Sequence, residues 1–354
     1  HVSTEEAPAL LSEWLQPLRQ QHPSARLTSG RIARAFAVEV FAVAGQELAV
    51  HALTGTEEHV PPVASYYVAL DTGQLAEATQ QAWARLFGDE GDAKARDQSS
   101  LIGAPVLQPA ELADWVGSLR LAVASGTSLA ERHNSYCRYV LLHLLAATGM
   151  RPVNDPFESL DMLDLPRSLA LVADKSSHQP NEARLVPLTA MTVALVTHWR
   201  DHLQRLARWV NESLPMLSLQ IETTLHATGP RALPLFFVLD DDLTVQRIDR
   251  STIEAWWPTG WTGLPANQLR RELATAASNG GWPAELVEQL LGHVDLGVPA
   301  FGAQSSLSPV ELQRSLPGLA AMLERQGWSE LASPLDVGPT RRGRPLPRFA
   351  AATA

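Results

Sequence analysis

Apolar positions recur at helical spacing along most of the first 125 residues. Leu11, Trp14 and Leu18 fall on one face of a helix that we expect over residues 8–21. Similar patterns predict further helices over residues 31–53 (helical or partly extended), 75–87 and 110–123. The N-terminal part of the chain is therefore predicted to be mainly helical.

The pattern changes from helical to mixed after Ser128, which is a plausible helix cap before a long periodic segment that runs to Leu145. Short apolar runs at residues 169–173 and 184–188 predict two strands of a hairpin, and residues 235–239 predict a third strand. Helices are expected around them at residues 189–210, 251–257, 267–279, 284–291 and 309–325. Pro283 and Gly292 frame the fourth of these, because proline favours the first helical turn and glycine the position past the end.

Charge bears on the choice of partner. The 354 residues carry a formal net charge of −10, which counts against nucleic acid, since neutralising phosphates requires surplus Lys and Arg. The arginines are nevertheless clustered, at Arg270–Arg271 and near the C-terminal end, and the local field decides where DNA can dock. The basic cluster near the C-terminal end comprises Arg341, Arg342, Arg344 and Arg348.

Other chemistry is not indicated. The single cysteine, Cys137, excludes an internal disulfide framework and fits a reducing cytoplasm. The longest apolar runs reach about a dozen residues, whereas a bilayer-spanning helix needs about 20. His293 and Asp295 have no further ligands at suitable spacing for a metal, and no glycine-rich phosphate loop is visible. We therefore expect a cytoplasmic protein with no cofactor, metal or membrane partner.

Three separated segments of the sequence place arginine, lysine or histidine at the ends of predicted helices and strands. The first is Ala147-Thr148-Gly149-Met150-Arg151 at a predicted helix end. The second is Ala173-Asp174-Lys175 followed, after a turn, by Arg184-Leu185-Val186-Pro187-Leu188. The third is Asn267-Gln268-Leu269-Arg270-Arg271 followed by Leu290-Leu291-Gly292-His293.

In this order, the three pieces resemble the catalytic domain of the tyrosine recombinases, the phage integrase family. The resemblance implies that Arg151 and Arg270 bind the scissile phosphate, that Lys175 is the general acid, and that His293 is a supporting donor. Guanidinium groups suit this chemistry because they offer paired hydrogen bonds to the charge that builds on phosphate oxygens. A lysine beside the leaving oxygen can supply its proton.

Two positions depart from the family pattern. Asn267 stands where the family has a histidine, and it cannot titrate near neutral pH. The nucleophilic tyrosine would fall nine residues after His293, which here is Gly302, beside Phe301. No tyrosine follows Tyr139. Because phenylalanine has no hydroxyl, the family's covalent intermediate cannot form at this position.

Several explanations remain open. The chain is either a naturally degenerate recombinase that keeps the fold and the phosphate-binding groups, or an active recombinase whose tyrosine has been replaced by Phe301. The one-residue offset and Asn267 favour natural degeneracy. A third hypothesis, supported by the acidic net charge, is a protein-interaction module on the recombinase fold.

Two further features bear on DNA. The segment from Thr340 to Arg348 resembles an AT-hook, whose slim Arg-Gly-Arg-Pro core enters narrow minor grooves; the alternative is a loose basic tail. Trp256, Trp257 and Trp261 could stack on bases, but packing in a core or interface is the more common role.

Taken together, the sequence predicts a mixed α+β protein in three parts: a helical domain at 1–125 that could clamp DNA, a recombinase-like domain at 126–330 with helices around a small antiparallel sheet, and a flexible basic tail at 331–354. The expected partner is double-stranded DNA, bound by the catalytic-position residues, by Arg271 and by the tail arginines. An active recombinase or another mobile-element protein, and oligomers formed on DNA, are further expected partners.

Overall fold

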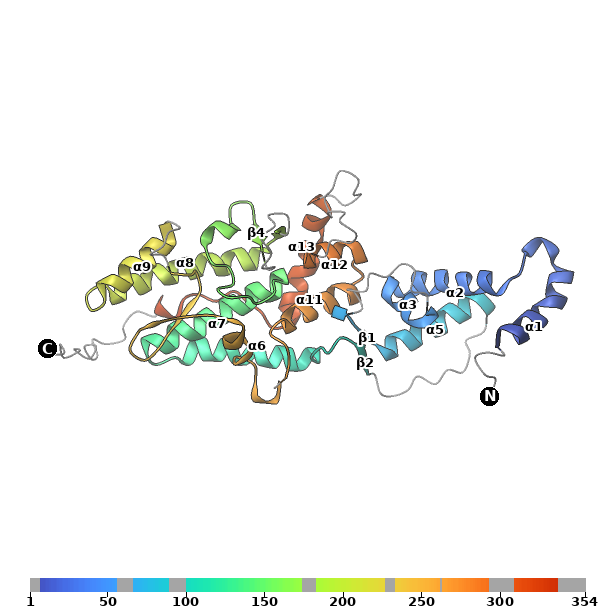
Figure 1. Cartoon of the computed structure of the whole chain (residues 1–354), viewed down its shortest axis with the longest axis horizontal. Helices are drawn as coiled ribbons and strands as arrows, with labels where there is room; N and C mark the ends of the chain where they lie inside the picture. Colours follow the sequence, from blue (N-terminus) through green and yellow to red (C-terminus); the bar gives the residue numbers. More distant parts are fainter. Residues whose placement is uncertain are drawn as a thin grey trace. The chain divides into compact units, whose positions relative to one another are not determined.

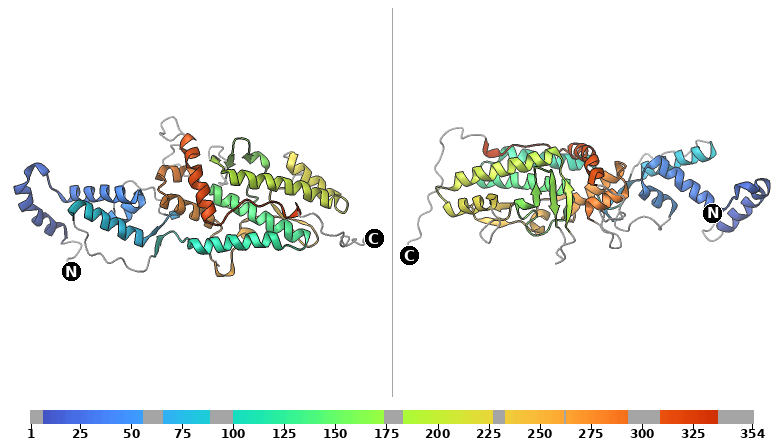
Figure 2. Two further views of the ribbon diagram at one scale, coloured as in Figure 1. Left: turned by 180° about the vertical axis from the view of Figure 1, so that it is seen from behind. Right: turned by 90° about the horizontal axis from the view of Figure 1, so that it is seen from above.

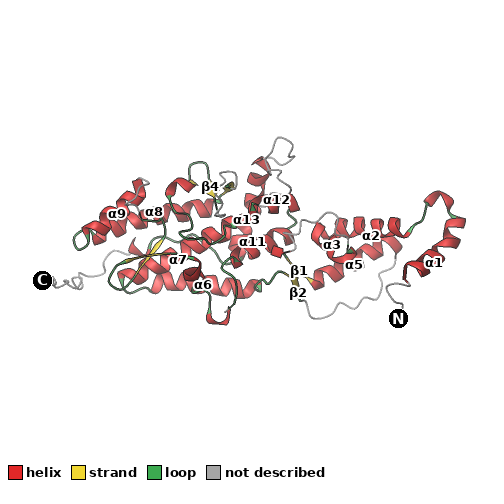
Figure 3. Ribbon diagram, viewed as in Figure 1, coloured by secondary structure: helices red, strands yellow, loops and turns green. Residues whose placement is uncertain are grey.

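The computed structural model describes residues 7–55, 66–88, 100–173, 183–226, 233–261, 263–292 and 309–336. Within these ranges helices dominate, with three small antiparallel sheets, so the predicted mixed α+β class is confirmed (Figure 3). The chain forms two compact units. The first combines His1–Leu107 with Gln268–Arg314, and the second combines Gln108–Asn267 with Ser315–Ala354.

The first unit is mainly helical, as expected (Figure 1). The predicted helix at 8–21 is confirmed, and the segment at 31–53 is helical except at residues 45–46. Gly45 divides that segment into two helices, because its left-handed backbone (φ 65°) caps the first of them. The elements of this unit are α1 (Ala7–Gln21), η1 (Pro23–Ala25), α2 (Ser29–Ala44), α3 (Glu47–Thr54), β1 (Ala69–Asp71), α5 (Thr72–Phe87), β2 (Leu101–Gly103), α11 (Gln268–Asn279) and α12 (Ala284–Leu291).

The pair of strands β1 and β2 was not expected from the sequence. They run antiparallel, with Leu70 opposite Ile102. Gly103 has φ 101°, and a Cβ atom placed there would lie 2.6 Å from the Val68 carbonyl oxygen. The close approach of the two strands therefore requires glycine at this position.

The second unit contains the predicted hairpin. Strands β4 and β5 pair antiparallel, with Val172 opposite Arg184, and β3 adds a third strand beside β4. Figure 2 shows these strands as arrows among the helices of this unit. The elements are α6 (Pro109–Ser125), α7 (Leu129–Thr148), η2 (Leu160–Met162), β3 (Leu163–Asp164), β4 (Leu169–Val172), β5 (Arg184–Pro187), α8 (Ala190–Val210), α9 (Pro215–His226), β6 (Phe237–Leu239), β7 (Val245–Arg247), α10 (Arg250–Glu254), η4 (Thr259–Trp261), α13 (Pro309–Arg325, in this unit from Ser315) and η6 (Pro334–Asp336).

Helix α7 is the centre of the second unit. Ser128 caps it as predicted: its hydroxyl accepts from the Glu131 amide, and the Glu131 carboxylate accepts from the Ser128 amide. Leu141, Leu142 and Leu144 are fully buried, although they point in different directions around the helix. A helix that is apolar on all sides must be covered on all sides, and this fixes the position of its C-terminal end.

The boundaries of the compact units differ from those expected. We expected a division near residue 125, but helix α6 joins the second unit, and its Trp115 packs 5.0 Å from Trp257 of the same unit. This contact also gives Trp257, which is buried, the packing role.

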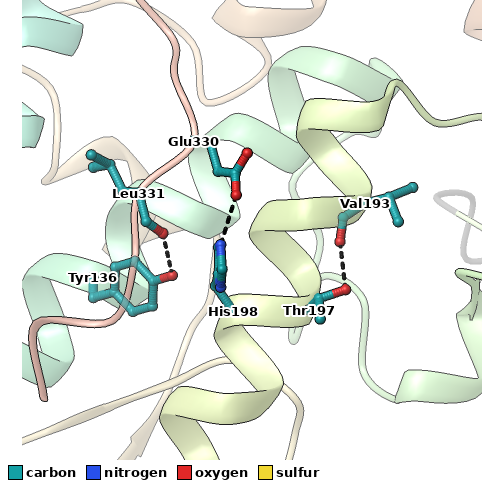
Figure 4. A network of polar contacts seen from close by, with 6 residues as sticks. All are labelled: Tyr136, Val193, Thr197, His198, Glu330 and Leu331. Atoms are coloured by element: carbon teal, nitrogen blue, oxygen red, sulfur yellow. Dashed lines mark hydrogen bonds and ion pairs between the residues drawn. The ribbon is translucent and has the colours of Figure 1, made fainter. Parts of the chain in front are cut away.

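The basic tail was expected to begin at residue 331. Ser333 and Leu335 are instead buried in the second unit. The segment before them is tied down by the Tyr136 hydroxyl, which donates to the Leu331 carbonyl at 2.8 Å, and by a contact of 2.8 Å between His198 and Glu330 (Figure 4). The tail can therefore begin no earlier than residue 337, and residues 337–354 lie outside the described part of the chain.

Candidate functional site

Arg151 is positioned by the end of helix α7. The helix ends at Gly149, whose left-handed backbone (φ 60°) lets its amide donate to the Leu145 carbonyl at 3.0 Å. Met150 is buried directly after this cap, and Arg151 follows it, half-buried. A buried helix end thus holds the backbone of Arg151 in a defined place.

The predicted hairpin begins beside this helix end. Arg184, the first residue of β5, donates from its Nη2 atom to the Gly149 carbonyl at 3.3 Å. A cation suits this place, because the C-terminal end of a helix carries partial negative charge. Within the second unit, the structure therefore brings together two of the three sequence pieces. Lys175 itself lies outside the described residues.

The third piece is assembled within the first unit. Arg270 lies on α11 and is buried. Its Nη2 atom donates a hydrogen bond at 2.5 Å to the carbonyl oxygen of Leu291, which is the last residue of α12. Its guanidinium carbon lies 4.9 Å from the centre of the Tyr67 ring. The arginine and the Leu-Gly segment thus meet within this unit, although His293 lies outside the described residues.

Arg271 has a different environment from Arg270. Its Nη2 atom donates to the Tyr66 hydroxyl at 2.9 Å, and its guanidinium carbon lies 4.9 Å from the centre of the same ring. Arg271 is only 7% exposed, whereas Tyr66 is 57% exposed. Tyr66 was missed in the sequence reasoning, because nothing local connects it with an arginine more than two hundred positions away.

The next residue of α11, Glu272, is a buried carboxyl group. It accepts hydrogen bonds from the Leu107 amide at 2.8 Å and from Gln268 Nε2 at 2.7 Å. Burial raises its pKa to about 7, and the two hydrogen bonds only partly offset this effect. Its carboxyl group is therefore committed to the packing of the first unit.

The remaining predicted site residues divide into two groups. Asn267 lies half-buried, one residue before α11 begins. The others lie outside the described part of the chain: Lys175, His293, Phe301, Arg341, Arg342, Arg344 and Arg348. Arg151 belongs to the second unit and Arg270 to the first, and each is described within its own unit. The roles that the resemblance implies for all of these residues stay predictions.

A second group of titratable side chains lies in the core of the second unit. His133 Nδ1 is 3.1 Å from His202 Nε2, and His133 Nε2 is 3.0 Å from the Phe237 carbonyl oxygen. His202 Nδ1 is in turn 2.8 Å from Ser333 Oγ. Burial lowers the pKa of His133 to about 4. Both rings are fully buried, so this arrangement joins α7, α8, β6 and the residue before η6, and it does not form an open site.

Two kinds of site are not found among the described residues. That part of the chain has no group of three or more His, Cys, Asp or Glu side chains arranged to hold a metal ion. Nor does any helix within the described ranges combine the length and the apolar character needed to span a membrane.

Comparison with known proteins gives a weak structural likeness. A crystal structure of XerA recombinase is 15% identical, covers 89% of this chain and 98% of its own, and has a TM-score of 0.34. An integrase from mycobacterium phage Brujita is 14% identical, covers 90% of this chain and 95% of its own, and has a TM-score of 0.33. No family model and no curated protein matches the chain. Likenesses at these TM-scores do not establish a common fold, so the function proposed below rests on the residues themselves.

Proposed function

We propose that this chain binds double-stranded DNA as a tyrosine-recombinase-like protein that does not cleave strands itself. The proposal rests on one observation: each described piece of the sequence resemblance folds on the element that the resemblance implies. Arg151 follows a capped helix end, β4 and β5 pair antiparallel, and Arg270 bonds to the residue before Gly292. This agreement supports the roles assigned to the two arginines.

The chemistry of these residues suits the phosphate backbone. A guanidinium group can donate two parallel hydrogen bonds to a phosphate, and its charge acts more strongly where water is excluded. Arg151 is half-buried and Arg270 buried. Cleavage is absent from the proposal because neither Phe301 nor Gly302 has a hydroxyl group for attack on phosphorus. The protein then acts beside an active recombinase or another protein of a mobile element.

The test measures the affinity of the full chain for a generic DNA duplex by fluorescence anisotropy, at salt concentrations from about 50 to about 300 mM. The informative variants are Arg151→Ala, the double variant Arg151→Ala/Arg270→Ala, and a truncation at Gly338. A matched control, Arg85→Ala/Arg167→Ala, removes the same charge from two exposed arginines that pair with Glu39 and Asp164. Circular dichroism checks each variant, because Arg270 also holds the end of α12.

We expect the affinity to fall steeply as the salt concentration rises. Arg151→Ala should lower the affinity, the double variant should lower it further, and the control should leave it unchanged. If only the truncation loses binding, the tail is the DNA contact and the proposed role of the two arginines is wrong. If the full chain does not bind DNA even at low salt, a protein-interaction module is the better description. The net charge of −10 favours this second candidate.

A further inference from the structure

Arg271 is a buried cation without a counter-ion in the described part of the chain. Its residue is 7% exposed, and no described carboxylate lies within ion-pair distance of it. Its Nε atom is buried and has no hydrogen-bond partner among the residues that the structure describes. Burying a charge without its counter-charge destabilises the fold, and an anion bound beside Arg271 would offset this cost.

The nearest acidic side chain does not meet this need. Glu272 follows Arg271 directly, but consecutive residues of a helix point about 100° apart. Its carboxyl group accepts from Leu107 and Gln268 instead. Arg270, the residue before Arg271, is itself a cation and cannot serve as the counter-ion.

The hydrogen-bond partner of this buried charge, Tyr66, is an exposed residue. It is 57% exposed, and its hydroxyl oxygen accepts the Arg271 hydrogen bond at 2.9 Å. A hydroxyl that accepts one hydrogen bond still has its own proton to donate. Accepting a bond from a cation polarises the hydroxyl and makes it a stronger donor.

We propose that Tyr66 and Arg271 form a binding site for one backbone phosphate of duplex DNA, in which a phosphate oxygen accepts from the Tyr66 hydroxyl and Arg271 supplies the charge behind it. This inference rests on the proposed function and adds a contact to it. The site lies entirely within the first unit. It involves no covalent step, and its ligand is the phosphodiester anion of the DNA backbone.

The site makes an unusual prediction for an uncharged substitution. Each phosphate neutralised on duplex DNA adds about 0.9 to the slope of log affinity against log salt. Tyr66→Phe keeps the ring over Arg271 and removes no charge, yet it should remove this phosphate contact. A tyrosine that serves only as a packing partner for arginine would leave the salt slope unchanged.

The experiment measures duplex affinity across the same salt series for the full chain and for Tyr66→Phe, Arg271→Gln and the double variant. Arg85→Gln is the matched control, because it removes the same charge from an exposed arginine of the same unit. We expect Tyr66→Phe to weaken binding about fivefold at low salt and to lower the slope by about 0.9. Arg271→Gln should do at least as much, the double variant no more than Arg271→Gln, and the control nothing.

Other outcomes overturn the inference. If Tyr66→Phe binds with the affinity and slope of the unchanged chain, Tyr66 does not contact phosphate, and the proposed function stands without this site. If the unchanged chain itself fails to bind at low salt, the proposed function is wrong and this inference falls with it. Circular dichroism tests the folding of Arg271→Gln. Should that variant unfold, Tyr66→Phe decides alone, because it preserves the ring contact.

Discussion

Acid should destabilise the second unit through its buried histidines. His133 and His143 are fully buried, and burial lowers their pKa values to about 4 and about 3. Their pKa in the unfolded chain is about 6.5. Because the unfolded chain takes up protons first, the free energy of unfolding falls as the pH drops from about 6.5 toward these lower values. Between about pH 7.5 and about pH 5 the loss is about 2 kcal/mol for each histidine.

A loss of about 4 kcal/mol from both is large beside the 5–15 kcal/mol that typically stabilises a domain. The assay is urea unfolding of the full chain at the two pH values. Hydrogen exchange is measured in a peptide that covers part of α7, so the unfolding midpoint is that of the second unit alone. The informative variant is His143→Gln, whose amide can still bond to Thr192, as His143 Nε2 does at 2.9 Å. It should be less stable than the unchanged chain at neutral pH, but its loss on acidification should be smaller by about 2 kcal/mol.

The quantity to compare is the loss of unfolding free energy on acidification, in the variant and in the unchanged chain, and not their absolute stabilities. His226→Gln is the control, because His226 lies exposed on α9 of the same unit. It should show the same acid-induced loss as the unchanged chain. If His143→Gln also shows the full loss, His143 titrates alike in the folded and unfolded states, and its burial does not make the second unit sensitive to acid.

Three further predictions concern stability. Glu272→Gln should stabilise the first unit by about 3 kcal/mol near pH 8, since burial raises the Glu272 pKa from an ordinary 4.5 to about 7. The unfolded chain therefore ionises first as the pH rises from about 4.5 to about 7, and the full loss of stability is present above pH 7; an unchanged urea midpoint for an α11 peptide would contradict this. Ser128→Ala should cost about 1 kcal/mol through the loss of the α7 cap, measured as faster hydrogen exchange in the first turn of that helix. Gly103→Ala should cost more than about 2 kcal/mol, because its Cβ would lie 2.6 Å from the Val68 oxygen and φ is 101°; a urea midpoint equal to that of the unchanged chain would show that the strands can move apart.

Helices whose ends are marked by capping residues could be predicted from the sequence. Ser128 and Gly149 mark the two ends of α7, and Pro283 and Gly292 those of α12, within one or two residues. These residues act locally, through a side-chain cap or a left-handed backbone, so a short stretch of sequence is enough to predict where the helix ends. The hairpin could be predicted for the same reason, since its two strands are close in sequence.

Other features depend on partners far apart in the chain. Strands β1 and β2 have three residues each, too few for a periodic signal, and helix α9 was missed because its apolar residues do not keep to one face. Arg271 was predicted as a DNA contact from its basic neighbourhood, but its burial and its bond to Tyr66 come from tertiary folding. No local pattern specifies a contact between residues this distant.

The row of buried hydrogen bonds through His133 and His202 has a direction that the main chain sets at one end and that the serine at the other end can satisfy. At one end the Phe237 carbonyl can only accept, so His133 Nε2 must bear its proton and His133 Nδ1 must accept from His202 Nε2. At the other end the Leu335 amide donates to Ser333 Oγ at 3.1 Å, which leaves the serine proton to bond to His202 Nδ1. Both neutral rings are thus held in the Nε2–H tautomer, and neither can reverse by itself. A threonine at position 333 would preserve this order, whereas an alanine would leave a buried imidazole nitrogen with no donor.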